Sequence, residues 1–174
     1  GVEVEKGALV FDPDNNVGLV VADDIDGLTH TVAGVEVEKL PRQGLSVEAW
    51  FTVGAADVPL AGLAGAEQDG LRCHKGWSLV HSRTALGNTS STVLFKVSVG
   101  AIQGAQGFGG FAHVSHTVTP ALPLHDWVHV AATYDGTALS LYLDGRPAAS
   151  SPACPAPPCG PIVYPSRLSP QGEC

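Results

Sequence analysis

The chain has 174 residues, of which 44% are hydrophobic and only 15% are charged, with 21 Gly and 13 Pro. This composition is typical of one globular domain with many turns, and it argues against both disorder and a helical bundle. The formal net charge of −8 argues against nucleic acid or an anionic membrane as a partner. No apolar run is long enough to insert into a bilayer.

Short apolar runs with turns between them predict strands along the whole chain. We expect these strands near residues 2–5, 8–11, 17–22, 35–39, 45–53, 77–82, 92–99, 111–119, 127–134 and 138–143. "GVEVEK" occurs at 1–6 and again at 34–39, and it predicts two half-buried strands whose glutamates face water. Only the Gly-broken segment 58–67 shows any helical periodicity.

The turns after the first strands carry many side chains with hard oxygen ligands. Four aspartates are candidate ligands of one Ca²⁺ ion, namely Asp12, Asp14, Asp24 and Asp26. Asn15, Asn16 and Asp23 offer further carboxamide and carboxylate oxygens. The spacing is not that of an EF-hand. The alternative is a pair of solvated turns in which Asp and Asn side chains cap the backbone.

The segment "GAIQGAQGFGGFAH" (100–113) places two phenylalanines among glycines. Phe108 and Phe111 are candidate ligand-binding residues, because exposed rings would form a platform for a sugar ring or for a partner's side chain. The alternative is that both rings fold inward and that the glycines only serve turns.

The segment "HDWVHVAATYDGTALSLYLDG" (125–145) predicts a hairpin, since two alternating runs are separated by an Asp-Gly turn. His125 and His129 have the spacing of a helical zinc site. On a strand, however, two residues so spaced are about 13 Å apart, too far to share one zinc ion. We expect Trp50 and Trp127 to be buried, with Trp127 on a central strand.

Four cysteines form an even set without zinc-type spacing, namely Cys73, Cys154, Cys159 and Cys174. The last three lie in a proline-rich stretch that reads as too irregular for a core, which favours disulfides in an oxidising compartment over reduced core thiols. Three connectivities are open. The sequon at Asn88 is a candidate glycosylation site and agrees with an extracellular location. The chain contains no Met, so we expect it to start at a processed or trimmed end.

Several segments in order resemble the laminin-G-like, concanavalin A-like jelly-roll superfamily. They are "GALVFDPDNN", "LSVEAWFTV", "GWSLV" and above all Trp-x-His-Val-Ala followed by the Tyr-Asp-Gly and Tyr-Leu-Asp-Gly turns. The resemblance implies an all-β, two-sheet antiparallel jelly-roll sandwich over residues 1–150. Residues 151–174 would be a Pro/Cys-rich tail of the same domain or a truncated continuation. The closing strand with Gly-x-Ile-Asp, usual in such domains, is not evident.

The superfamily includes glucanases, but the residues give no sign of catalysis. Glu3-Val4-Glu5 and Glu36-Val37-Glu38 supply only pairs of the three carboxylates that jelly-roll glucanases align on one strand. We therefore expect no enzyme, but an extracellular recognition or adhesion module that binds glycan or protein and contacts neighbouring domains. The alternatives are an accessory carbohydrate-binding domain of a secreted glycosidase or protease, and a structural packing module.

Overall fold

The computed structural model describes residues 2–5, 8–11, 29–32, 35–38, 40–54, 60–70, 73–83, 90–102 and 110–164. Within these ranges the chain forms strands joined by turns and bends, and no helix long and apolar enough to cross a membrane is found there. The strands are β1 (Val2–Glu5), β2 (Ala8–Phe11), β3 (Thr29–Val32), β4 (Val35–Glu38), β5 (Leu45–Phe51), β6 (Ala61–Gly70), β7 (Cys73–Arg83), β8 (Ser91–Val97), β9 (Ala112–Val118), β10 (Val128–Tyr134), β11 (Ala138–Leu143) and β12 (Arg146–Pro152).

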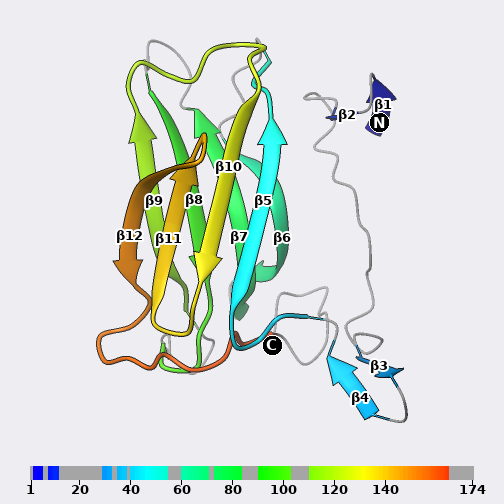
Figure 1. Cartoon of the computed structure of the whole chain (residues 1–174), viewed down its shortest axis with the longest axis vertical. Coiled ribbons are helices and arrows are strands. Elements are labelled where there is room, and N and C mark those ends of the chain that lie inside the picture. The colour runs from blue at the N-terminus through cyan, green and yellow to red at the C-terminus, as the bar shows by residue number, and fades with distance from the viewer. Residues whose placement is uncertain are drawn as a thin grey trace.

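Two four-stranded sheets form a sandwich (Figure 1). One sheet has the order β12-β11-β10-β5 and the other the order β6-β7-β8-β9, and neighbouring strands pair antiparallel throughout. The hairpins β1–β2 and β3–β4 are separate two-stranded sheets outside the sandwich. The prediction of an all-β antiparallel jelly-roll sandwich is confirmed.

The core lies between the two sheets and is built by strict alternation along the strands. In β10 every second side chain is buried, from Val128 to Tyr134, as the period-2 pattern predicts. The same alternation in β8 buries Val93, Phe95 and Val97 from the other sheet. Leu139 and Leu141 of β11 complete the layer on the β10 side. Burying apolar side chains of this size stabilises the fold by about 1.5–3 kcal/mol each.

Some expected elements differ from those observed. The segment 58–67, the only one with a trace of helical periodicity, belongs largely to strand β6. Glycines at 62, 65 and 70 disfavour a helix, while the exposed and covered side chains of β6 largely alternate as a sheet edge requires. Strand β12 carries little apolar alternation and was not expected, whereas the expected strand at 17–22 lies outside the described residues.

The two tryptophans expected in the core are largely exposed. Trp50 is 65% exposed and Trp127 is 54% exposed, so the prediction of their burial is wrong. In β5, Val47, Ala49 and Phe51 pack against the core, and alternation therefore sends Trp50 to the outer face. Trp127 precedes β10 and does not belong to it. A large apolar side chain alone does not determine the face on which it lies.

Candidate binding groove on the β6–β9 sheet

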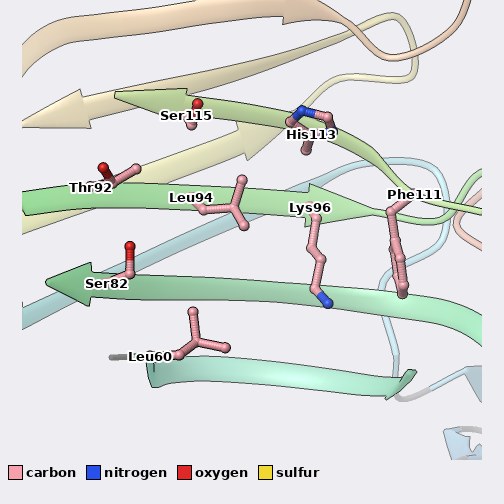
Figure 2. Close-up of a pocket in the computed structure, with 8 residues that line it drawn as sticks. All are labelled: Leu60, Ser82, Thr92, Leu94, Lys96, Phe111, His113 and Ser115. Carbon is pink, nitrogen blue, oxygen red and sulfur yellow. The ribbon is translucent and has the colours of Figure 1, made fainter. Parts of the chain in front are cut away.

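The outer face of the β6–β9 sheet carries a groove of about 370 Å³. Its floor comes from the outward-pointing side chains of β8, which are Thr92, Leu94 and Lys96. In register on β9, Ser115 lies opposite Leu94 and His113 lies opposite Lys96. Figure 2 shows the eight lining residues, which are Leu60, Ser82, Thr92, Leu94, Lys96, Phe111, His113 and Ser115.

Phe111 stands at one end of the groove beside Lys96 (Figure 2). The Lys96 ammonium lies 4.5 Å from the centroid of the Phe111 ring, a cation–π distance, and the His74 ring meets Phe111 edge-on at 6.2 Å. These two contacts fix the orientation of the ring, which stays partly exposed. The structure thus places the predicted binding residue Phe111 on a groove, while Phe108 lies outside the described residues.

Lys96 is neutralised by two carboxylates from β6. Its Nζ lies 2.7 Å from Asp69 Oδ2 and 3.1 Å from Glu67 Oε2, and Asp69 also contacts His74 Nδ1 at 2.7 Å. Partial burial lowers the pKa of Lys96, but the hydrogen bonds and charges of Asp69 and Glu67 outweigh burial and raise this pKa above its usual value. The ammonium therefore stays charged but is internally paired.

Glu67 and Asp69 were not expected at this site. Because β6 is a strand, their Glu-x-Asp spacing places both side chains on its outer face. The trace of helical periodicity in this segment obscured that signal. Burial raises the pKa of the Asp69 carboxyl, but hydrogen bonds from Lys96 and His74, together with their charges, outweigh it and hold this pKa below its usual value. Asp69 is therefore ionised at neutral pH.

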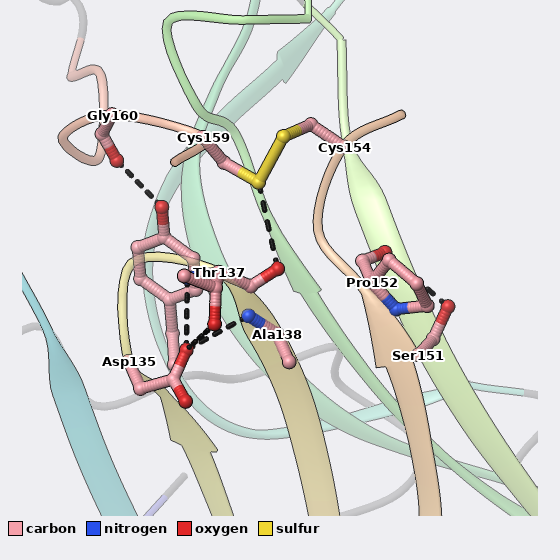
Figure 3. The surroundings of a disulfide bond; sticks show 9 residues. Asp135, Thr137, Ala138, Ser151, Pro152, Cys154, Cys159 and Gly160 are labelled. Atoms are coloured by element: carbon pink, nitrogen blue, oxygen red, sulfur yellow. Dashed lines mark hydrogen bonds between the residues drawn. A yellow bond between two sulfur atoms is a disulfide. The ribbon is translucent and has the colours of Figure 1, made fainter. Parts of the chain in front are cut away.

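The Pro/Cys-rich stretch closes the end of the sandwich up to residue 164. Cys154 is disulfide-bonded to Cys159, and Cys73, fully buried in β7, is disulfide-bonded as well. The sulfur of Cys159 lies 3.5 Å from the Thr137 carbonyl oxygen, drawn as a dashed line in Figure 3; this is a contact, because a disulfide sulfur carries no proton. Cys174 lies outside the described residues.

The expectation that this stretch is too irregular for a core is wrong for five residues between 153 and 164, although residues 155–158 are exposed. Ala153, Cys154, Cys159, Ile162 and Tyr164 are buried in the main core cluster. Irregular backbone is tolerated there because its polar groups are paired, as backbone burial requires. The bonds run from the amide of Cys159 to Gly136 O, from Ile162 to Arg42 O and from Val163 to Ser98 O, and from the Tyr164 hydroxyl to Pro41 O.

We call residues 159–164 the closing segment, because it bonds to both sheets. Within it, Gly160-Pro161-Ile162 has the Gly-x-Ile spacing of the closing strand that is usual in such domains, with Val163 where Asp would be usual. Ile162 forms an isolated antiparallel bridge with Val99. Pro161 inside this motif obscures the signal, since proline is depleted in strands.

The remaining predicted residues are placed as follows. The candidate calcium ligands Asp12, Asp14, Asp24 and Asp26 and the sequon Asn88 lie outside the described residues, so calcium binding and glycosylation stay predictions. His125 lies in a turn with φ 65°, and His129 lies on β10. In the described part of the chain, no three His, Cys, Asp or Glu side chains form a group able to hold a metal ion.

Comparison with known proteins agrees with this architecture. A protein-family model described as the concanavalin A-like lectin/glucanases superfamily matches residues 26–161. The matched range includes both four-stranded sheets and the groove, and it ends within the closing segment. A search of curated proteins gave no match.

Proposed function

The chain belongs to the concanavalin A-like lectin/glucanase superfamily, whose members include carbohydrate- and protein-binding modules, and from this premise we propose that it is a non-enzymatic recognition domain that binds a neutral glycan. The observation that carries the proposal is the groove on the outer face of the β6–β9 sheet. We place the domain in a secreted or cell-surface protein, because stable disulfides are typical of oxidising compartments.

The lining of the groove has the two kinds of group that a sugar ring needs. Phe111, Leu60 and Leu94 offer apolar surface to the C–H faces of a pyranose. Around them, the hydroxyls of Ser82, Thr92 and Ser115 and the imidazole of His113 are donors and acceptors for sugar hydroxyls. Binding sites for small ligands share this combination of apolar lining and a few orienting polar groups.

The charges around the groove favour a neutral sugar over a sulfated or sialylated one. The Lys96 ammonium lies over the Phe111 ring, and Glu67 and Asp69 already neutralise it. An anionic ligand would have to displace these carboxylates and would also meet the repulsion of a chain with net charge −8.

The same geometry argues against Asp69 as the general acid of a glycosidase. A glycosidase needs one carboxylic acid that stays protonated, beside a second carboxylate. Glu67 and Asp69 share one ammonium, and the lowered pKa of Asp69 keeps that side chain ionised, so it is unsuited to be the acid.

The test is a titration of the purified domain with neutral oligosaccharides and with their sulfated counterparts, followed by calorimetry and NMR. We expect a neutral sugar to shift the resonances of His113 and Ser115, and Phe111→Ala to weaken its binding by about tenfold or more. Trp50→Ala is the matched control, because it truncates an exposed aromatic ring on the other sheet. Preferential binding of the sulfated sugar, or unchanged binding by Phe111→Ala, would refute the proposal.

A further inference from the structure

The opposite sheet exposes two of the three tryptophans of the chain. Trp50 lies on the outer face of β5, and Trp127 directly precedes β10, the strand that pairs with β5. Tryptophan is mostly well buried in folded proteins, and exposed apolar patches mark interaction surfaces, so two exposed tryptophans on two neighbouring chain segments point to such a role. The core does not need these rings, since alternation packs other side chains of β5 inward.

The Trp50 ring is held in place by its cross-strand neighbour. In the β5–β10 register Trp50 lies opposite His129, and the two rings are tilted by 42° with centroids 5.0 Å apart. His129 Nε2 lies 3.3 Å from Glu48 Oε2, and the His129 amide donates a hydrogen bond of 3.0 Å to Asp144 Oδ1. Glu48 therefore orients the imidazole, while Asp144 holds the backbone of His129. The imidazole supports Trp50 from one side, and the indole stays open to solvent.

Three carboxylates neighbour the two tryptophans in the sequence, on the same face of β5 or through His129. Glu48 has 76% of its side chain exposed, and Asp126 and Asp144 are exposed beside the same strand. Indole faces attract cations through their quadrupole, and carboxylates add to this attraction. Arg146, two residues after Asp144, is the only lysine or arginine between residues 128 and 152.

We propose that the surface formed by Glu48, Trp50, Trp127, His129 and Asp144, the Trp50 surface, binds a basic segment of another protein. An arginine or lysine side chain of the partner stacks on the Trp50 indole and places its charge beside Glu48. Tryptophan is among the residues that contribute most binding energy at protein interfaces. A second copy of the chain is disfavoured, because each copy carries a net charge of −8.

The Trp50 surface is separate from the glycan groove. The surface lies on the sheet β12-β11-β10-β5, whereas the groove residues Thr92, Leu94 and Lys96 lie on the sheet β6-β7-β8-β9. Both are outer faces of one sandwich, so they point in opposite directions. The domain would bind a sugar and a protein at the same time. Binding at each surface can therefore be measured with variants that leave the other surface unchanged.

The experiment titrates the full chain with a short peptide of alternating arginine and glycine, and with the same peptide carrying serine in place of arginine. Calorimetry gives the affinity, and NMR gives the indole N–H resonances. We expect the arginine peptide to shift the signals of Trp50 and Trp127 but not that of Trp77 on β7. We expect Trp50→Ala to weaken binding by about tenfold, and Glu48→Gln to weaken it less and to reduce its salt dependence.

Two control variants accompany these measurements. Ser46→Ala changes the same face of the same strand, and Phe111→Ala changes the other sheet; both should bind the arginine peptide as the parent does. Equal binding of the serine peptide, or no binding of either peptide, would overturn the proposal. Binding of a neutral sugar, or self-association, that Trp50→Ala abolishes would assign the surface to a different occupant and would overturn it as well.

Discussion

The amide of Gly76 donates a hydrogen bond of 2.8 Å to the carbonyl oxygen of Val163, which ties strand β7 to the closing segment. The Gly76 carbonyl in turn accepts a bond of 2.8 Å from the Ser98 amide. Gly76 has φ 99°, and a Cβ atom there would come within 2.7 Å of the Glu67 Cα and clash with the Ala66 carbonyl oxygen. Only glycine fits this position, because it tolerates positive φ and has no side chain.

The first prediction follows directly. Gly76→Ala should lower the free energy of unfolding by at least about 2 kcal/mol, because it adds backbone strain to a clash with β6. Urea denaturation measures the change. Gly62→Ala on β6 is the matched control, since a Cβ there meets nothing within 4 Å. Equal urea midpoints for the two variants would show that β6 and β7 do not approach each other so closely.

The disulfide of the closing region should contribute measurable stability. The double variant Cys154→Ala/Cys159→Ala opens a loop with a sequence separation of only 5 and should lose about 2 kcal/mol. Thermal unfolding with and without reductant checks this. The reductant should lower the melting temperature of the parent more than that of the variant, which lacks this disulfide. Thiol labelling of the denatured, unreduced protein is an independent check, and two or more reactive thiols per chain would contradict the assignment.

Asp135 should stabilise the β10–β11 turn through its side chain. Asp135 Oδ1 accepts bonds of 2.7–2.8 Å from the Thr137 hydroxyl and from the amides of Thr137 and Ala138, and these bonds hold the pKa of the carboxyl below its ordinary 3.8. Such a group adds stability above its unfolded pKa, and this is lost as pH falls through its folded pKa. Asp135→Ala should therefore lower the melting temperature at pH 7, with less difference from the parent in strong acid.

A second variant separates the hydrogen bonds from the charge at this turn. Asp135→Asn keeps an acceptor oxygen and should restore part of the lost stability. The turn also presents the carbonyls of Gly136 and Thr137 to the amides of Cys159 and Ala153, so its loss should loosen the closing region. If both substitutions left the melting temperature unchanged, the side-chain bonds would have no structural role.

His81 should make the domain sensitive to mild acid. Its side chain is buried against Phe51, with ring centroids 5.3 Å apart, and burial together with the charge of Arg83 lowers the pKa of the imidazole below 6.5. The unfolded chain then binds a proton more readily than the folded one, so stability falls as pH drops through 6.5 toward the folded pKa. Urea midpoints between pH 8 and pH 5 should fall less steeply for His81→Phe; parallel curves would contradict this.

The hairpin at 128–143 was predictable because signals within its own sequence specify its strands and its turn. Alternation from Val128 to Tyr134 and the turn residues Asp135-Gly136 are local signals, and the observed burial follows them. The exposure of Trp50 was not predictable in the same way. Which face of β5 turns inward depends on the sheet that covers it, and residue type alone favoured the wrong answer.

The groove was only partly visible in the sequence for a related reason. Phe111 was a candidate because of its glycine-rich surroundings, but Lys96, Glu67 and His113 come together only through the registers of β6, β7, β8 and β9. Those registers depend on non-local pairing, which no single segment specifies. The closing segment is similar, because its Gly-x-Ile signal gains meaning only once Ile162 is seen beside Val99.

The closing segment also determines how the domain would bear a pulling force. Tension applied to the chain beyond residue 164 reaches the bonds at Gly76, Ser98 and Arg42 before it reaches β12. The bond between Cys154 and Cys159 removes residues 155–158 from the load path, because force passes through the sulfurs and the intervening loop cannot lengthen. A pull from this side is therefore resisted first by these three bonds, which anchor the closing segment to β7, to the end of β8 and to the chain that leads into β5.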